Sequence, residues 1–111
     1  MEKKVFFLLK SSPYQTLNNY EALRASISCF EHKVSVLWME DGVYLPLKRT
    51  DRKLTQPFIR LSQDMGVTLY VNETDLIDRG LDKHDLVPEA KPFDESKAFE
   101  LLLDADFVIT L

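Results

Sequence analysis

The sequence predicts an α/β protein, a three-layer α/β/α sandwich built on a mainly parallel sheet. Apolar runs of strand length alternate along the chain with amphipathic segments of helix length, and strands joined by crossover helices produce this alternation. The first run, Val5 to Leu9, is apolar at every position, which is typical of a central strand covered on both faces. A length of 111 residues suits one domain, so we expect residues 1–111 to form a single one.

Capping and turn residues indicate the next helix and strand. A helix is expected over residues 18–31, where Asn18 and Glu21 have the spacing of a capping box. Its apolar side chains recur at helical spacing, namely Leu23, Ile27 and Phe30, with Ala22, Ala25 and Cys29 as a flank of small residues. A second strand is expected over residues 34–39, because a Glu-Asp-Gly turn follows it, and residues 43–45 are expected to be briefly extended.

Proline and glycine delimit the second helix, which is expected near residues 56–65 after a basic loop at residues 48–53. Pro57 belongs in the first turn of this helix, where its missing N–H costs nothing. Gly66 is expected to end the helix in the left-handed conformation. The predicted apolar face consists of Phe58, Leu61 and Met65. A third strand is expected over residues 67–71, which are rich in β-branched and aromatic side chains.

The last forty residues are expected to contain two helices and a final strand. A short helix over residues 72–79 would be capped by Asn72 or Thr74 and ended by Gly80. The loop that follows is expected to contain a short extended piece at residues 86–88. Asp94 is the expected cap of the last helix, whose predicted inward side chains are Phe99, Leu102 and Leu103. Residues 107–111 are expected to close the chain as a strand.

The composition excludes several classes of protein. The single cysteine, Cys29, rules out an internal disulfide framework and a CxxC zinc or redox motif. Because His32 and His84 are isolated in the sequence, no metal site is expected. No apolar stretch is long enough to span a membrane, and residues 1–9 are not followed by a small-residue cleavage site. We therefore expect a cytoplasmic protein with a reduced thiol.

Charge is unevenly distributed along the chain, whose net charge is −4. Residues 1–60 hold ten basic and six acidic side chains, whereas residues 61–111 hold four and twelve. The acidic total argues against a nucleic-acid binder. The asymmetry suits a protein that meets a partner through complementary faces, although ordinary solvated surface charge also explains it. The basic loop at residues 48–53 is equally open to two interpretations, a solvated loop or a contact with RNA or an acidic partner.

The sequence contains no complete catalytic set. It has no GxGxxG or GxxxxGK[ST] phosphate motif and no GxSxG nucleophile elbow, so no enzyme activity and no cofactor is assigned. In an open parallel sheet, ligands bind beyond the carboxyl ends of the strands. The polar candidates at those ends, for a ligand crevice or an interface, are Ser11, Ser12, Tyr14, Asp41, Tyr44 and Asn72. The alternative is that these side chains only cap helices and turns. Cys29 is either a packed small hydrophobe or, less in keeping with its helix position, a reactive thiol.

Four motifs in this order resemble the DsrE/DsrF/TusC sulfur-relay family, and most of all its DsrF/TusC branch. They are Ser11-Ser12-Pro13-Tyr14 after the first strand, Asp41-Gly42-Val43-Tyr44, Arg79-Gly80-Leu81, and the terminal segment from Ala105 to Leu111. The resemblance covers essentially the whole chain. It implies a five-stranded, largely parallel sheet and an assembly, a trimer or hexamer, that forms either by self-association or with DsrE-like and DsrH-like homologous subunits.

The resemblance also implies a process, the transfer of persulfide sulfur toward tRNA 2-thiolation or within sulfur oxidation. Sulfur-carrying members have a cysteine just after the third core strand, and in this sequence that position falls on Asn72. An amide cannot form a persulfide, since the transfer needs a thiolate nucleophile. We therefore expect a non-carrying, accessory subunit, with a homo-oligomeric small-ligand-binding module as the alternative.

Overall fold

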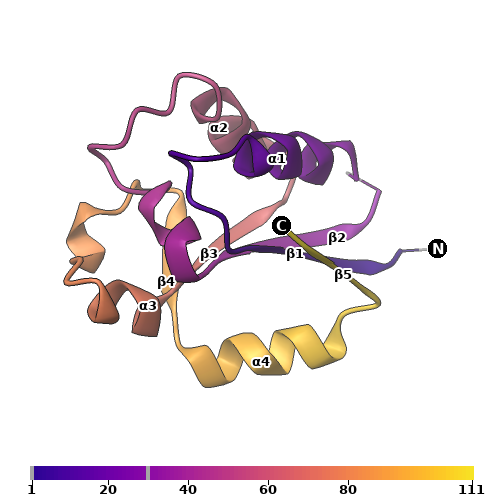
Figure 1. The fold of residues 1–111 in the computed structure, drawn as a ribbon. Coiled ribbons are helices and arrows are strands. Elements are labelled where there is room, and N and C mark those ends of the chain that lie inside the picture. Colours follow the sequence, from indigo (N-terminus) through magenta and orange to yellow (C-terminus); the bar gives the residue numbers. More distant parts are fainter. Residues whose placement is uncertain (1, 30) are drawn as a thin grey trace.

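The computed structural model describes residues 2–29 and 31–111, which form one sheet of five parallel strands in the order β4-β3-β2-β1-β5 (Figure 1). The strands are β1 (Lys4–Leu9), β2 (Lys33–Trp38), β3 (Thr68–Asn72), β4 (Ala90–Phe93) and β5 (Phe107–Thr110). The helices are α1 (Asn18–Ser28), α2 (Gln56–Asp64), α3 (Glu73–Asp78) and α4 (Glu95–Asp104), with short 3₁₀ helices η1 (Glu40–Tyr44) and η2 (Lys83–Asp85). In the described ranges every strand pairing is parallel, as the strand–helix alternation predicted.

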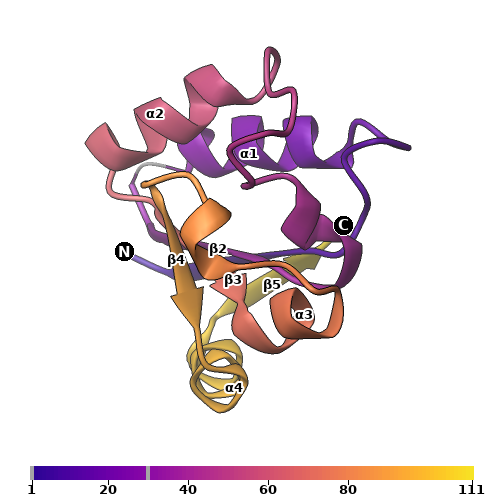
Figure 2. The ribbon, with the colours of Figure 1, turned by 90° about the vertical axis from the view of Figure 1, so that its left-hand side faces the viewer.

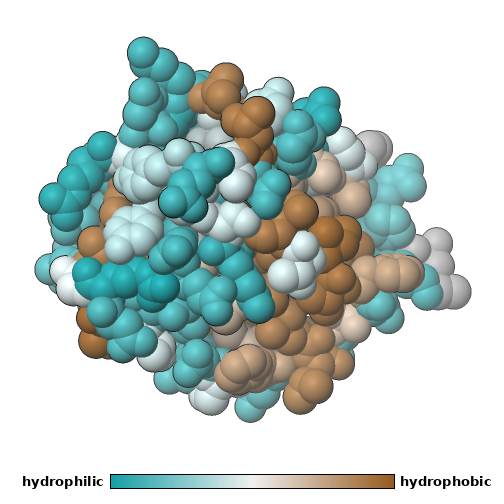
Figure 3. Space-filling model, viewed as in Figure 1, coloured by the Kyte–Doolittle hydropathy of each residue, from teal (hydrophilic) through white to brown (hydrophobic). Residues whose placement is uncertain are grey.

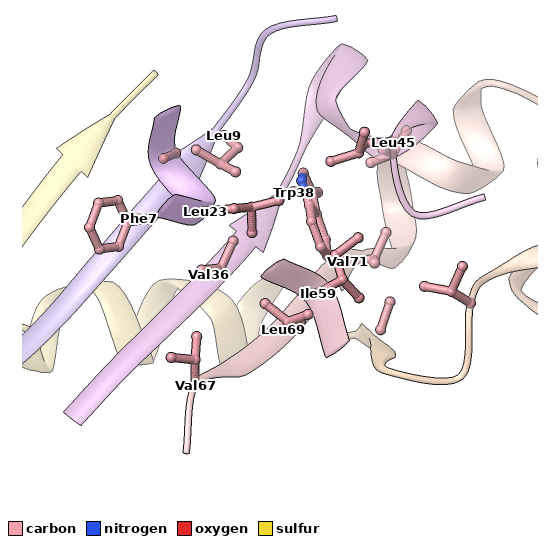
Figure 4. Packing of buried hydrophobic residues seen from close by; sticks show 14 of the residues in the cluster. Phe7, Leu9, Leu23, Val36, Trp38, Leu45, Ile59, Val67, Leu69 and Val71 are labelled. Carbon is pink, nitrogen blue, oxygen red and sulfur yellow. The ribbon is translucent and has the colours of Figure 1, made fainter. Parts of the chain in front are cut away.

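Helices cover both faces of the sheet. α1 and α2 lie on one face and α4 lies on the other (Figures 1 and 2), which confirms the three-layer sandwich. Because both faces are covered, β1 has no face open to water: it is buried from Val5 to Leu9 and pairs with both β2 and β5. On the α1/α2 face, Phe7, Leu23 and Trp38 belong to the larger apolar cluster (Figure 4). Each such side chain contributes about 1.5–3 kcal/mol on full burial.

The start of α1 is not a capping box. Leu17 occupies the N-cap position and makes no side-chain capping bond. The Asn18 side chain instead donates from Nδ2 to Ser11 Oγ at 3.1 Å, so it is held by a contact with the β1 loop and not by the start of its own helix. Glu21 pairs with Arg24, at 2.8 Å. The helix ends at Ser28, and the predicted contact of Phe30 lies outside the described residues.

α2 begins and ends as predicted, but the centre of its buried face differs from the prediction. Pro57 lies in its first turn, and Gly66 follows it with φ +73°. The fully buried side chains of the helix are Ile59 and Ser62, while Leu61, predicted to face the core, is 42% exposed. Phe58 and Met65 only flank the buried stripe. The spacing therefore predicted two core contacts of α2 correctly, Phe58 and Met65, but the centre of the buried face lies one residue farther along the chain than predicted.

Two extended segments differ from the sequence-based expectation. Residues 43–45 are not extended, because η1 turns tightly there against the end of β1. The sequence did not predict the fourth strand, β4, at residues 90–93, whereas in the short piece expected at residues 86–88 Leu86 is extended and makes one antiparallel bridge with Leu47. β4 is a short edge strand that contains Pro92, and proline is tolerated in a sheet at its edge. Because this strand also contains a lysine, its sequence does not show the apolar pattern by which a strand is predicted.

The carboxyl-terminal helix is capped as predicted. Asp94 Oδ1 accepts a hydrogen bond from Ser96 N at 2.9 Å. The Ser96 hydroxyl and backbone N–H together hold the pKa of the Asp94 carboxyl below its usual value. Ala98 is buried against the sheet and Leu102 packs beside it. Phe99 and Leu103, however, are 53% and 88% exposed, so their predicted inward orientation is wrong.

The sheet ends in β5, which is exposed at all four residues and whose described pairing is with β1. Val108 lies in register with Phe6 on the α4 face of the sheet, whereas Phe107 and Ile109 lie on the α1 face, so the exposed apolar surface extends from α4 around the edge strand β5. We call this surface the α4/β5 apolar face; its members are Phe99, Leu103, Phe107, Val108 and Ile109. Figure 3 shows apolar surface gathered over this part of the molecule.

Candidate functional site

The carboxyl ends of β1, β2 and β3 lead into three segments that meet at one edge of the sheet. The loop at residues 10–17 follows β1, η1 follows β2, and α3 follows β3 (Figure 1). The start of α4 after β4 joins them from the other face (Figure 2). This is the edge at which ligands bind in open parallel sheets, and its polar side chains form two separate clusters.

The first cluster ties the β1 loop to α1 and to the chain end. Ser11 Oγ donates to Leu111 O at 2.8 Å and accepts from Asn18 Nδ2 at 3.1 Å. Ser11 O accepts from Asn19 Nδ2 at 3.0 Å. The buried Asn19 in turn accepts a hydrogen bond at Oδ1 from Trp38 Nε1, at 2.8 Å. Ser11 therefore positions the loop, and its hydroxyl is occupied on both its donor and its acceptor side.

Tyr14, farther out along the same loop, lies beside Tyr44 of η1. Their ring centroids are 6.3 Å apart, and the Tyr14 hydroxyl lies 3.4 Å from Thr50 Oγ1. Thr50 Oγ1 donates to Tyr44 O at 2.6 Å, so the threonine fixes both tyrosines. Ser12 Oγ accepts from Tyr14 N at 3.2 Å, which is a local turn contact. Of these residues, Tyr14 and Thr50 line a cavity on the α1/α2 side of the molecule.

The second cluster is centred on Asn72, which is only 1% exposed. Its Nδ2 donates to Asp75 Oδ2 at 2.8 Å and, more weakly, to Glu95 Oε1 at 3.4 Å. Arg79 lies 3.5 Å from Asp75 Oδ1 and 3.2 Å from Asp41 Oδ1, so one guanidinium links two carboxylates. We call these five residues the Asn72 cluster. The amide is held between anionic acceptors, and its own Oδ1 is buried without a hydrogen-bond partner.

A tight backbone turn brings Asp41 to Arg79 across the sheet edge. Met39 N donates to Leu9 O at 3.0 Å, which pulls the start of η1 onto the end of β1. A Cβ atom at Gly42 would lie 2.2 Å from Leu9 O, so only glycine fits this approach. Glu40 adopts φ +51°, and its N–H donates to Asp75 Oδ2 at 2.8 Å. The hydrogen bond stabilises a left-handed residue that lacks the freedom of glycine.

The six residues chosen from the sequence divide between the two clusters. Four of them, Ser11, Ser12, Tyr14 and Tyr44, lie with the β1 loop, while Asp41 and Asn72 lie in the Asn72 cluster. Sequence reasoning missed their partners, which are Asn19, Thr50, Asp75, Arg79 and Glu95. The i,i+4 spacing of Asp75 and Arg79 on a helix was the one available signal.

Cys29 lies at the other end of the sheet. α1 runs antiparallel to the strands, so its last turn reaches the amino ends of β1 and β2, where His32 Nδ1 accepts from Lys3 N at 3.1 Å. Cys29 is half-buried and packs against the larger apolar cluster. Within residues 2–29 and 31–111, no group of three or more His, Cys, Asp and Glu side chains is placed to hold a metal ion. In the same ranges, no helix has the length and hydropathy needed to cross a membrane.

The fold and the site define a class: small α/β proteins with five parallel strands whose carboxyl edge presents hydrogen-bonded side chains between β3 and α3. The particular family follows from comparison of sequences. The chain belongs to the DsrE/DsrF-like family, whose sequence profile matches residues 3–111. It is 34% identical over 93 residues to a protein of Allochromatium vinosum named intracellular sulfur oxidation protein DsrF, and the match covers 77% of this chain and 68% of that protein.

Solved structures share the fold at lower sequence identity. The ychN protein from E. coli superposes with a TM-score of 0.84 at 19% identity, over 100% of both chains. MTH1491 from Methanobacterium thermoautotrophicum, described as a protein of unknown function, has a TM-score of 0.73 at 14% identity, again over 100% of both chains. These similarities confirm the architecture.

Proposed function

We propose that this protein is a non-carrying, accessory subunit of an intracellular sulfur relay, in which persulfide sulfur passes between cysteines of homologous subunits. Membership of the DsrE/DsrF-like family supports the proposal, as does the 34% identity to a protein named for intracellular sulfur oxidation. That name favours sulfur oxidation as the process over tRNA 2-thiolation. We place the protein in the cytoplasm and treat residues 1–111 as one domain.

Asn72 is the observation that carries the proposal. It is the last residue of β3 and directly precedes α3, the position that the family resemblance assigns to the carrier cysteine. The amide is almost fully buried and donates to two carboxylates, so it offers neither a nucleophile nor access to a donor persulfide. A persulfide forms when a thiolate attacks sulfur, and nothing at this position can supply one.

The α4/β5 apolar face supports assembly with other subunits. Five large apolar side chains are exposed on two adjacent elements, whereas scattered single residues are the rule on monomeric proteins. β5 also has an unpaired edge among the described residues, which invites strand pairing. DsrE-like and DsrH-like chains of the same fold are the proposed partners, and a trimer or hexamer of this chain alone is the alternative.

Native mass spectrometry of the chain, alone and co-expressed with its cysteine-bearing homologues, tests the assembly. We expect a mixed complex, and we expect the Leu103→Lys variant to disrupt it by placing a charge on the α4/β5 apolar face. Because Leu103 is 88% exposed, its replacement should leave the fold intact. Leu61→Lys on α2 is the matched control, an exposed apolar residue away from this face, and should assemble normally. A chain that never associates with a cysteine-bearing homologue contradicts the proposal. A stable trimer or hexamer formed alone favours the ligand-binding module.

Sulfur labelling tests the non-carrying role. A partner cysteine loaded with radioactive persulfide sulfur by a cysteine desulfurase should keep the label or pass it to another partner, with none on this chain. A complex containing Cys29→Ala should transfer sulfur at the rate of the unmodified complex. Label recovered on Cys29, or a large loss of rate in the Cys29→Ala complex, would show that this chain carries sulfur itself.

A further inference from the structure

A cavity of about 490 Å³ is lined by residues of the β1 loop, the start of α1 and the loop that leads into α2. It lies apart from the Asn72 cluster and shares only Tyr14 with the residues chosen from the sequence. Its volume is within the range of about 300–1,000 Å³ that small-molecule sites occupy. Neither cluster at the sheet edge explains why the two loops stand apart here.

The wall of the cavity is mainly apolar and aromatic. Tyr20 and Leu45 lie deeper in it, and Tyr20 is held edge-on against Phe58 with ring centroids 5.5 Å apart. Tyr14, Leu17 and Leu54 line the same cavity and are each more than half exposed. Apolar side chains around an open hollow gain the most from a ligand that covers them, because their area is then removed from water.

Two polar residues, Thr55 and Asn19, are among those that line the cavity. Thr55 lines the cavity, and its Oγ1 is buried without a hydrogen-bond partner. A buried hydroxyl in this state costs free energy that a ligand oxygen could recover by accepting its hydrogen bond. Asn19 also lines the cavity and is hydrogen-bonded to Trp38, the one tryptophan of the sequence. Occupancy of the cavity therefore has a built-in fluorescent reporter.

Positive charge lies along one side of the opening. The loop at residues 48–53 contains four basic side chains and a single acidic one, Asp51. Arg52 is fixed in place, because its guanidinium donates to Thr50 O at 3.0 Å, to Gln56 Oε1 at 2.8 Å and to Leu47 O. Lys53 lines the cavity beside it and is exposed. An anionic group at the mouth would meet both cations.

We propose that this cavity binds a small organic anion, a ligand with an apolar or aromatic body and one carboxylate, sulfonate or phosphate group. The body fills the space between Tyr20 and Leu45, and the anionic group lies at Arg52 and Lys53 with an oxygen directed to Thr55. The sulfur relay and the assembly face play no part in this proposal, so it stands or fails separately from the proposed function.

The test uses 8-anilinonaphthalene-1-sulfonate as the anionic probe and its neutral analogue N-phenyl-1-naphthylamine, with the fluorescence of the probe and of Trp38 followed together. We expect saturable binding of one sulfonate per chain, a change in Trp38 emission, and affinity about tenfold weaker for the neutral compound. Higher salt should weaken only the anion, because its charge is exposed at the mouth.

Two variants and two controls localise the binding. Thr55→Val should weaken the sulfonate by about threefold to tenfold without lowering the midpoint of urea unfolding, since the hydroxyl has no partner to lose. Lys53→Gln should weaken it similarly and reduce its salt dependence, whereas Lys91→Gln, an exposed lysine outside the cavity, should not. The Leu103→Lys variant should bind normally. Equal affinity in all variants, or binding lost only in Leu103→Lys, overturns the proposal.

Discussion

Replacing Asn72 by aspartate changes one nitrogen to oxygen and tests whether the Asn72 cluster is built around an amide. The new carboxylate would lie about where Nδ2 now donates to Asp75 at 2.8 Å and to Glu95 at 3.4 Å. Two like charges at 2.8 Å repel by about 6 kcal/mol at an effective dielectric constant of about 20. Arg79 offsets part of this repulsion, because it already pairs with Asp75.

Protonation limits the cost. An aspartic acid whose pKa is about 3.9 when unfolded needs about 4 kcal/mol to stay protonated at pH 7, and the protonated group can donate to Asp75 as the amide does. We therefore expect Asn72→Asp to lower the free energy of unfolding by about 2–4 kcal/mol at pH 7. The folded-state pKa of the new carboxyl is raised, so the loss is full above that pKa and disappears as pH falls toward 4, with a slope of at most about 1.4 kcal/mol per pH unit.

Urea unfolding followed by the fluorescence of the buried Trp38 measures the difference at each pH. Asn18→Asp is the matched control, because the Ser11 hydroxyl can rotate from Leu111 O and donate to the new carboxylate, and residue 18 lies in the first turn of α1, where negative charge is favourable. It should change stability by less than about 1 kcal/mol. An Asn72→Asp protein as stable as the parent at pH 7, or a deficit independent of pH, would refute the geometry of the cluster.

Three further predictions concern the turn at η1, the cap of α4 and the carrier position. Gly42→Ala should cost about 3 kcal/mol or more in urea unfolding, since the new Cβ would lie 2.2 Å from a backbone oxygen of β1; a loss below about 1 kcal/mol would mean that the turn yields easily. Asp94→Ala should lower the urea midpoint at neutral pH. Ser96 lowers the folded-state pKa of Asp94, so the capping contribution is fully present above the unfolded-state pKa of 3.8 and is lost as pH falls through the lower, folded-state pKa. The stabilities of the two proteins should therefore converge in acid. A difference in stability that does not change with pH would assign the effect to helix propensity. In a Cys29→Ala background, a thiol introduced as Asn72→Cys should react with iodoacetamide at pH 7 at least about tenfold more slowly than a free thiol. The reason is that burial and adjacent carboxylates raise the pKa of a thiol. Fast alkylation would show that the site remains competent for sulfur chemistry.

The proposed role depends on two properties that a single subunit shows together. Its position after β3 holds an amide engaged with carboxylates, and its α4/β5 apolar face is left open on the isolated chain. A subunit that contributes surface to an assembly and leaves the thiol chemistry to a homologue needs both properties. The cavity beside the β1 loop is a third feature, and an anion bound there would give the subunit a binding activity of its own.

Sequence patterns predicted the elements whose environment is uniform along their length. The run from Val5 to Leu9 is buried on both faces, so its apolar character alone indicated a central strand. Asp94 and Gly66 were predicted correctly because a helix end depends on one or two neighbouring residues. β4 could not be found in this way, since Pro92 and the exposed residues of an edge strand carry no apolar pattern.

By itself the sequence determined the parallel α/β architecture, the positions of most helix ends and the absence of a thiol after β3, because these properties depend on local periodicity or on the identity of one residue. Only the tertiary structure decided which side chains meet. Arg79 contacts Asp41, which is 38 positions away in the sequence, and the Asn18 side chain binds Ser11 instead of capping its own helix. Leu103 faces outward, although helical spacing predicted that it would face the core. Each of these outcomes depends on how separate elements pack, and that information is distributed over residues that are distant in the sequence.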